Sequence, residues 1–324
     1  MLHCAGCTWL SVTELAVVNF DLEEYLSARR SIVDRALERY LVRQPGCAES
    51  IWRAMRYGLF PGGKRIRPIL TLAAGELFAA KQKELLPFAC AVEMIHAYSL
   101  IHDDLPALDD DDLRRGTPTA HKVFGEGMAL LAGDALLTEA FHLISGPATR
   151  SQEPQVVLEL IHELGRAAGV AGLVGGQAID LETEKKNAAI STVEAMHGRK
   201  TGALIVASLK IGARVGAAKP LEVKRICRYG EAVGLAFQIA DDLLDSAGES
   251  GGEESGRKEE KKATYPSMVG VPQAKERLRE LMVLAVKSVV PFGFKAEALK
   301  AIAIYVAQRA LRDGTNSRRQ EMNC

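Results

Sequence analysis

Apolar residues recur at helical spacing along nearly the whole chain, and this periodicity constrains the fold more than any other feature. In 20–41, for example, apolar side chains return every three or four residues, as they do on one face of a helix. The same spacing is found in 51–57, 69–78, 85–105, 129–144, 156–174, 192–215 and 221–245. Alternating β-branched runs bounded by hairpin turns are missing from the sequence. The pattern therefore predicts an all-α fold.

Glycine and proline pairs separate the helical segments. They fall at Pro45-Gly46, Pro61-Gly62-Gly63, Gly116-Thr117-Pro118 and Gly175-Gly176, where turns are expected. Residues 246–262 are rich in Gly, Ser, Glu and Lys and contain no large apolar side chain, which predicts a flexible loop. Because helical spacing resumes at Tyr265, we expect one helical domain over 20–324 with a mobile flap. Residues 1–19 are an N-terminal extension to which we assign no role.

Composition excludes several classes of protein. The 324 residues carry 41 Lys+Arg and 41 Asp+Glu, so the chain lacks the overall basic charge of a nucleic-acid-binding protein. The six cysteines are scattered rather than spaced as a disulfide framework, which favours reduced thiols and a cytoplasmic location. The first Lys or Arg is Arg29, so we expect no secretory signal. No run approaches about 18 uncharged apolar residues, so we expect no membrane span.

An acidic cluster lies at the end of the apolar segment 85–105. Asp103, Asp104 and 109–112 place six carboxylates in ten residues, and only two arginines follow at once. Such carboxylates repel one another, which indicates bound divalent metal, because Mg²⁺ takes carboxylate oxygens and bridges to phosphate. Asp103 and Asp109 would point to different faces of a continuous helix, but Pro106 breaks that helix and lets Asp109 return beside Asp103. A solvated acidic loop is the alternative.

A second acidic cluster ends the segment 221–245. Asp241 and Asp245 are four residues apart, so they share one helix face, and Asp242 lies between them. Carboxylates at a helix C-terminus are opposed by the helix dipole, which again indicates compensation by metal. Two such clusters facing each other would form a multi-metal clamp for a polyphosphate.

Three basic patches complete the pattern. They are residues 64–67 after two glycines, Arg114 with Arg115, and Lys200 inside an apolar helical run. Arg and Lys are the usual phosphate ligands, although each patch alone is more often a solvated surface. Together with the acidic clusters, the patches fit two diphosphate groups, one held through metal and one held by cations alone.

These motifs resemble, in order, those of the trans-isoprenyl diphosphate synthases, and most closely the short-chain farnesyl diphosphate synthases of bacteria. The resemblance runs from about residue 20 to about residue 310. The motifs that carry it are Gly62-Gly63-Lys64-Arg65-x-Arg67-Pro68, Asp103-Asp104-x4-Asp109 with Arg114-Arg115-Gly116, Gly175-Gly176-Gln177-x2-Asp180-Leu181, His197-x2-Lys200-Thr201-Gly202 and Phe237-Gln238-x2-Asp241-Asp242-x2-Asp245.

The resemblance implies a single bundle of ten or more antiparallel helices around a deep central cavity, and a homodimer. It implies that isopentenyl diphosphate is condensed head-to-tail with dimethylallyl and then geranyl diphosphate, giving farnesyl diphosphate (C15). The reaction would proceed by ionisation, condensation and elimination. It would use up to three Mg²⁺ ions, with Mn²⁺ as a substitute.

The resemblance also assigns roles by matching position. The metal ligands would be Asp103, Asp104, Asp109, Asp241, Asp242 and Asp245. Isopentenyl diphosphate would be bound by Lys64, Arg67, His96 and Arg115. The allylic diphosphate would be bound by Arg114, Lys200, Thr201, Gln238 and Lys258. The residues most directly involved in catalysis would be Lys200, Thr201, Gln238, Asp103 and Asp241. Gln177 and Asp180 would lie near the reacting carbons or the Lys200 end of the site.

Product length is predicted from the helix that leads into Asp103. Tyr98 would lie about 7.5 Å below the metal site by helical rise. In the family a bulky aromatic at this place stops chain growth, and Ser99 adds little further obstruction, so a C15 product is expected. If Tyr98 is simply a core aromatic, a geranylgeranyl diphosphate synthase (C20) is the alternative.

The flap departs from the family pattern. Residues 256–266 are shortened and lack the usual aspartate, so Lys258 fills the diphosphate-binding place with Arg257 as the competing alignment. Closure of the flap is thereby put in question. A non-catalytic partner subunit is a further alternative, although both aspartate clusters are intact.

Two other classes of helical protein compete with this interpretation. A di-iron carboxylate protein needs Glu-x-x-His pairs, and the chain has four, at Glu93/His96, Glu139/His142, Glu159/His162 and Glu194/His197. That spacing arises easily on polar helix faces. A terpene cyclase would share the metal-bound aspartates but would not need the cations Lys64, Arg67 and Arg115.

Overall fold

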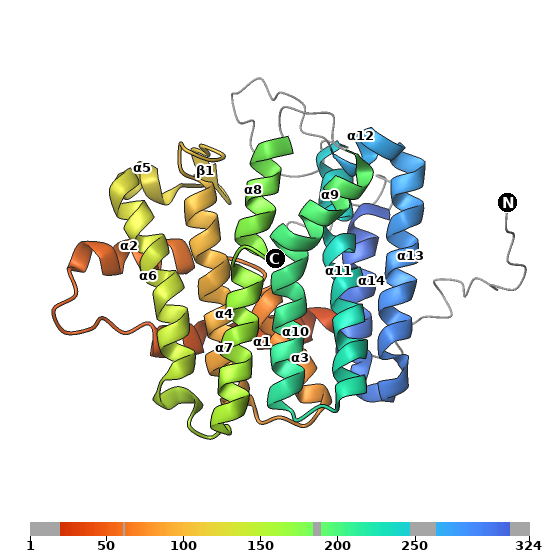
Figure 1. Cartoon of the computed structure of the whole chain (residues 1–324), viewed down its shortest axis with the longest axis horizontal. Helices are drawn as coiled ribbons and strands as arrows, with labels where there is room; N and C mark the ends of the chain where they lie inside the picture. Colours follow the sequence, from red (N-terminus) through yellow and green to blue (C-terminus); the bar gives the residue numbers. More distant parts are fainter. Residues whose placement is uncertain (1–19, 61, 184–188, 247–263, 312–324) are drawn as a thin grey trace, which may run out of the picture.

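The computed structural model describes residues 20–60, 62–183, 189–246 and 264–311, which form a bundle of long helices (Figure 1). Within these residues there are fourteen α-helices and one hairpin of two-residue strands. The expected all-α fold with ten or more helices is therefore confirmed. The N-terminal extension 1–19 and Lys258, with most of the predicted flap, lie outside the described residues.

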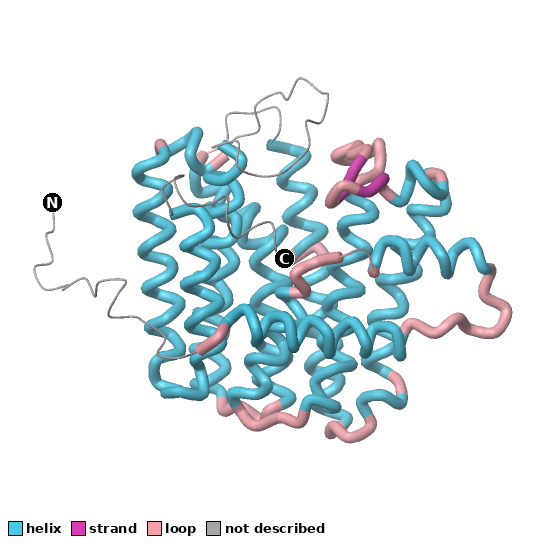
Figure 2. Tube along the Cα trace, turned by 180° about the vertical axis from the view of Figure 1, so that it is seen from behind, coloured by secondary structure: helices cyan, strands magenta, loops and turns pink. Residues whose placement is uncertain are grey.

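The elements follow one another along the chain, and most of the connections between them are short. In order they are α1 (Leu22–Tyr40), α2 (Glu49–Leu59), α3 (Ile66–Leu77), α4 (Gln82–Asp103), β1 (Leu113–Arg114), β2 (Thr117–Pro118), α5 (Ala120–Phe124), α6 (Glu126–Ser145), η1 (Pro147–Thr149), α7 (Pro154–Ala168), α8 (Leu173–Thr183), α9 (Ile190–His197), η2 (Gly198–Gly202), α10 (Ala203–Val215), α11 (Pro220–Ser246), α12 (Tyr265–Val269), α13 (Val271–Val289), η3 (Val290–Ala296) and α14 (Glu297–Leu311). Most of the long helices stand side by side, and α1 crosses behind them (Figures 1 and 2).

Helix α4 is the central helix of the bundle. Fifteen of its residues are buried, because its sequence is apolar on every face. It packs against α3 on one side and α6 on the other. One group of buried side chains joins α4 to α1, α2, α6 and α7, and a second joins α3 to α10, α11, α13 and α14. The C-terminal end of α4 is thereby fixed from several sides, and this is the end that carries Asp103.

The glycine pair at 175–176 does not form the turn that the sequence predicted. It lies inside α8, and the helical segment 156–174 is interrupted earlier, between α7 and α8. A Cβ at Gly175 would collide with the backbone of Val170, and one at Gly176 would collide with the backbone of Lys200. These glycines therefore serve close packing of α8, and Gly176 lets α8 approach η2.

The segment 192–215 is also not one regular helix. It consists of α9, the π-helical turn η2 and α10. Lys200 and Thr201 lie in η2. A π turn within a helix is a rare irregularity that frequently marks a functional site.

Two helices, α4 and α6, are long and apolar enough to cross a membrane by length and composition alone. The most apolar window of α4 is 83% buried within the protein, as expected of a core helix. That of α6 is only 33% buried, and Leu130 and Leu131 are 46% and 51% exposed. Helix α6 therefore exposes two adjacent leucines on a side that also carries the exposed Asp134 and His142.

Candidate active site

The first acidic cluster turns back on itself at the end of α4. The helix ends at Asp103 with Asp104 as its C-cap residue. The backbone N–H of Asp109 then donates to the carbonyl of Asp103 over 2.8 Å, and the N–H of Asp110 donates to the carbonyl of Leu105. The return of Asp109 beside Asp103, predicted from Pro106, is confirmed.

The carboxylates of this cluster have different partners. Arg114 Nε donates to Asp104 Oδ1 over 2.5 Å, and Arg114 also pairs with Asp111 at 3.2 Å. Lys122 pairs with Asp112 at 2.6 Å. Burial, opposed by the charge of Lys200, raises the pKa of Asp103 to about 6. Asp104 is thus held by Arg114, whereas burial leaves Asp103 short of cationic compensation.

The second acidic cluster occupies the last turns of α11. Burial raises the pKa of Asp241 and of Asp242 to about 6. Asp241 pairs with Arg309 of α14 at 3.3 Å, and Asp242 accepts a hydrogen bond from the backbone of Tyr265 over 2.7 Å. Asp245 is exposed. Two half-buried carboxylates at a helix C-terminus are electrostatically unfavourable unless a further cation joins them.

These carboxylates suit Mg²⁺ ions that would be bound jointly by the protein and by a substrate. In the described ranges no three His, Cys, Asp or Glu side chains are gathered as ligands of one ion. Mg²⁺ usually keeps several waters and binds through one or two carboxylates together with substrate phosphates. Asp103 and Asp109 at one helix end, and Asp241 and Asp242 at another, supply such oxygens.

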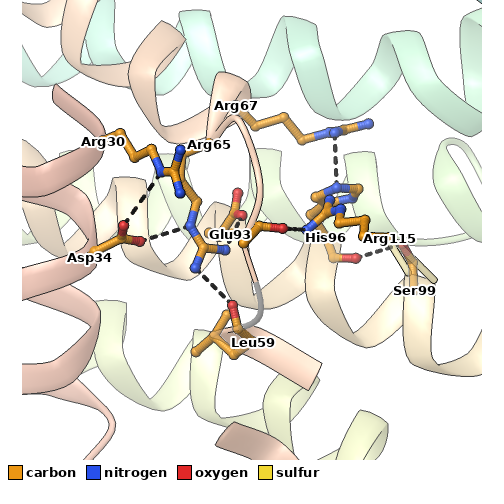
Figure 3. Close-up of polar contacts among 10 residues, drawn as sticks. Arg30, Asp34, Leu59, Arg65, Arg67, Glu93, His96, Ser99 and Arg115 are labelled. Atoms are coloured by element: carbon orange, nitrogen blue, oxygen red, sulfur yellow. Dashed lines mark hydrogen bonds and ion pairs between the residues drawn. The ribbon is translucent and has the colours of Figure 1, made fainter. Parts of the chain in front are cut away.

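A separate basic cluster lies where the start of α3 meets α4 (Figure 3). Arg67 Nη1 and His96 Nε2 lie 3.2 Å apart, and Arg115 Nη1 donates to the carbonyl of Gly62. A Cβ at Gly63 would lie 2.7 Å from Arg115 Nη1, so glycine there makes room for this guanidinium. Lys64 is exposed and its ammonium lies 3.5 Å from the hydroxyl of Tyr305. The structure thus brings together Arg67, His96 and Arg115, whereas the ammonium of Lys64 is directed toward α14.

Charge in the basic cluster is not balanced. Burial lowers the pKa of Arg67, and so does the charge of Arg115, while Glu93 and Asp241 act in the opposite direction. Burial and then the neighbouring arginines, Arg67 first among them, hold the pKa of His96 well below its ordinary value. His96 is therefore neutral, and Nε of Arg67 is buried without a hydrogen-bond partner. An anion entering here would meet the guanidinium of Arg67, whose Nε has no partner in the free protein.

Lys200 is held by an aspartate on a neighbouring helix. Its ammonium donates to Asp180 Oδ2 over 2.6 Å, and both side chains are largely buried. Asp180 lies on α8, which approaches η2 closely at Gly176. Thr201 follows Lys200 in η2, and Gln238 is half-buried on α11, three residues before Asp241. Gln177 on α8 is buried, and its side-chain oxygen has no hydrogen-bond partner.

Tyr98 lies in the buried interior of α4. It is 5% exposed and packs edge-to-face on His102, with ring centroids 5.7 Å apart. Burial and then the charge of Asp103 raise its pKa to about 12. The hydroxyl of Ser99 donates to the carbonyl of His96 over 2.9 Å. Tyr98 is therefore part of the core and also lies within electrostatic range of the first acidic cluster.

An ion-pair network of Arg65, Glu93 and Asp34 lies beside the basic cluster, although none of the three was expected to have a role of its own. The sequence contains one indication of this ion-pair network. Glu93 interrupts an otherwise apolar run, and a buried carboxylate needs a cationic partner.

The four Glu-x-x-His pairs do not form a di-iron site. Glu93 binds Arg65, Glu139 lies 3.3 Å from its own His142, and Glu159 binds Arg214. Glu194 accepts from the hydroxyl of Tyr265 and pairs with Arg277. Each glutamate has a partner other than a metal, so the di-iron alternative is not supported.

Comparison with known proteins agrees with this fold. A crystal structure described as an apo FPP/GFPP synthase from Zymomonas mobilis has a TM-score of 0.81 and 38% sequence identity, covering 90% of this chain and all of that one. The chain thus has the helical fold of isoprenoid synthases.

Residues 48–289 match the family model of polyprenyl synthetases. A farnesyl diphosphate synthase of Geobacillus stearothermophilus is 44% identical over 81% of this chain and 89% of its own length. A geranylgeranyl diphosphate synthase of Cyanophora paradoxa is 43% identical over 90% of this chain and 97% of its own. The chain belongs to the polyprenyl synthetase family.

Proposed function

We propose that the protein is a trans-prenyltransferase that condenses isopentenyl diphosphate with dimethylallyl and then geranyl diphosphate, giving farnesyl diphosphate. The observation that carries this proposal is the division of charge in the site. Carboxylates are gathered at the ends of α4 and α11, whereas the basic cluster holds guanidinium groups and a neutral histidine. Two diphosphates with different modes of binding match this division.

Isopentenyl diphosphate is assigned to the basic cluster. Arg67, His96 and Arg115 line it, and Lys64 stands at its exposed edge. Arginine forks suit diphosphate oxygens, and Nε of Arg67 is buried here without a hydrogen-bond partner. This substrate is the nucleophile and keeps its diphosphate, so a site built from cations alone is sufficient.

The allylic diphosphate is assigned to the carboxylate clusters. Asp103, Asp109 and Asp241 would hold Mg²⁺, with Asp104, Asp242 and Asp245 supporting. When bound, Mg²⁺ neutralises negative charge on the diphosphate and makes it a better leaving group. Lys200 supplies a fixed cation on η2, and we place the diphosphate oxygens beside it and beside Thr201 and Gln238.

The chain's own residues then favour condensation over hydrolysis. The apolar interior around α4 excludes water from the allylic cation that forms when the C–O bond breaks. The double bond of isopentenyl diphosphate attacks this cation, and a proton is lost to the released diphosphate. Binding both substrates in adjacent, preformed sites supplies the proximity that the step needs.

Tyr98 favours a C15 product over C20. Its buried ring occupies α4 one and a half turns before Asp103, in the direction in which a growing chain would extend. Relatives of this chain include a geranylgeranyl diphosphate synthase, so a C20 product is the second candidate. A non-catalytic partner subunit is disfavoured because both carboxylate clusters are present.

We also propose that the protein is a cytoplasmic homodimer that pairs through α6. This helix exposes Leu130 and Leu131, and only 33% of its most apolar window is buried within one copy of the chain. Sedimentation of the wild-type protein and of Leu131→Glu tests this arrangement, since the variant should sediment as a monomer.

The activity is tested by product analysis. Purified protein is incubated with Mg²⁺, dimethylallyl diphosphate and labelled isopentenyl diphosphate, with EDTA in a parallel sample. A metal-dependent C15 product supports the proposal. A C20 product would favour the second candidate, and the absence of elongation by folded protein would favour the partner subunit.

A further inference from the structure

We propose that Arg65 is a positioning residue for the basic cluster: with Glu93, Asp34 and the carbonyl of Leu59 it fixes the backbone that presents Lys64 and Arg67 to isopentenyl diphosphate. The inference rests on the proposed function, because that function assigns isopentenyl diphosphate to the basic cluster. It adds a residue that touches no substrate and acts through Lys64 and Arg67.

The guanidinium of Arg65 is held at three points. Nε donates to Asp34 Oδ1 over 2.9 Å, Nη1 donates to Glu93 Oε1 over 2.7 Å, and Nη2 donates to the carbonyl of Leu59 over 2.8 Å (Figure 3). The partners belong to α1, α4 and the end of α2. Arg65 is only 5% exposed, so its side chain points into the protein and not toward a ligand. Its planar fork thus ties three helices to one loop.

The backbone of Arg65 is left-handed, with φ 50° and ψ 34°. A side chain other than glycine rarely adopts this conformation, and it persists where the surroundings impose it. Here the buried guanidinium supplies that constraint. The turn directs Lys64 toward Tyr305 of α14 and lets α3 begin at once, so that Arg67 in its first turn reaches His96.

Helix α4 sets the register of this arrangement. Glu93 and His96 are three residues apart and lie on one face of α4, where Glu93 binds Arg65 and His96 contacts Arg67. Glu93 is 4% exposed, and its Oε2 is buried without a hydrogen-bond partner. Its negative charge acts on Arg67 and Arg115 as well as on Arg65. A single carboxylate therefore anchors the clamp and partly balances the guanidinium groups that await the diphosphate.

The test separates positioning from stability. In Arg65→Lys the charge is kept, but one ammonium cannot reach all three acceptors, so the loop loses its fixed conformation. We expect the KM for isopentenyl diphosphate to rise about 10- to 100-fold, as for a small misplacement of binding groups, while the KM for dimethylallyl diphosphate stays within about twofold. Asp34→Asn, at the half-exposed end of the clamp, should give the same split with a smaller rise.

Arg56→Lys is the matched control. Arg56 makes a bidentate ion pair with Glu38 at 2.6 and 2.7 Å, which joins α2 to α1 and includes no residue of the basic cluster. This variant loses an equivalent fork and should leave both KM values unchanged. If Arg65→Lys affected stability alone, its Tm would fall but the KM values for the two substrates would not change by different factors.

Equal changes in both KM values, or an unchanged KM for isopentenyl diphosphate, would overturn the role of Arg65. If Arg65→Lys does not fold, Asp34→Asn decides the question by the same comparison. Failure of the proposed function gives a different result, because the wild-type protein would then not bind isopentenyl diphosphate in direct titration.

Discussion

The backbone N–H of Asp109 donates to the carbonyl oxygen of Asp103, and this 2.8 Å hydrogen bond closes the acidic segment onto the end of α4. It brings two carboxylates, six residues apart in sequence, to one place. Asp104 is meanwhile bound by Arg114, so the adjacent residues Asp103 and Asp104 have different roles. Asp103 remains the carboxylate with the greater need for a cation.

Replacing Asp103 should therefore remove most of the activity. In Asp103→Asn we expect kcat to fall about 10²- to 10³-fold, the range for loss of one group that stabilises developing charge. The matched control is Asp112→Asn, because Asp112 belongs to the same acidic segment but is exposed and paired with Lys122. Steady-state kinetics with saturating Mg²⁺ measure both. Activity of Asp103→Asn within tenfold of wild type would contradict the assignment.

Shortening Tyr98 should lengthen the product. In Tyr98→Ala the buried ring is removed from α4, so we expect C20 and longer products in place of C15. The variant should also lose about 3–5 kcal/mol of stability, as for other large buried aromatics. Phe88→Ala, which removes another buried ring of α4, is the control and should lower Tm without changing product length. Unchanged C15 product from Tyr98→Ala would show that the ring serves the core alone.

Replacing Lys200 should weaken binding of the allylic substrate alone. Its ammonium, fixed by Asp180 at 2.6 Å, is assigned to the allylic diphosphate. We expect Lys200→Met to raise the KM for dimethylallyl diphosphate about tenfold or more, since a bond to a charged group is lost, and to leave that for isopentenyl diphosphate nearly unchanged. Lys210→Met is the control, because Lys210 pairs with Glu163, which keeps Arg166 as a partner. If Lys200→Met instead raised the KM for isopentenyl diphosphate alone, the assignment of the two substrates to the two sites would have to be exchanged.

Acid should destabilise the protein through His197. Burial, and to a smaller extent the charge of Lys200, lowers the pKa of His197 from 6.5 to about 4. Between these values the unfolded chain binds a proton that the folded protein does not, so the free energy of unfolding falls as pH drops. Above pH 6.5 this contribution is fully present, and its total size is about 3 kcal/mol.

Urea unfolding of wild type and His197→Gln at pH 7.5 and pH 5 measures this contribution as a difference between the two proteins. The variant should lose less stability on acidification. Some dependence should remain, because the pKa of His96 is lowered in the same direction. An identical loss in both proteins would mean that His197 is protonated in the fold.

Much of this architecture was predictable because its causes are local. Helical apolar spacing located the segments, and Pro106 explained the return of Asp109. The glycines at 175 and 176 were misassigned because a glycine pair serves a turn or a close approach equally well. Only the tertiary fold, which brings the backbone of Val170 against Gly175 and that of Lys200 against Gly176, distinguishes the two uses.

The clamp on Arg65 could not be predicted for a related reason. Glu93 in an apolar run signals a buried cation but does not say which one. The three partners of Arg65 come from three elements that only the tertiary fold brings together. The π turn at Lys200 likewise has no signal in the local sequence, since regular helix was equally compatible with its residues.

The central claim is that one diphosphate is held by cations alone and the other through metal. Isothermal titration of the wild-type protein in EDTA and in Mg²⁺ tests it, using isopentenyl diphosphate and an unreactive thiolodiphosphate analogue of the allylic substrate. We predict that isopentenyl diphosphate binds with similar affinity in both buffers and that the analogue binds only with Mg²⁺. Loss of isopentenyl diphosphate binding in EDTA, or tight metal-free binding of the analogue, would contradict the account.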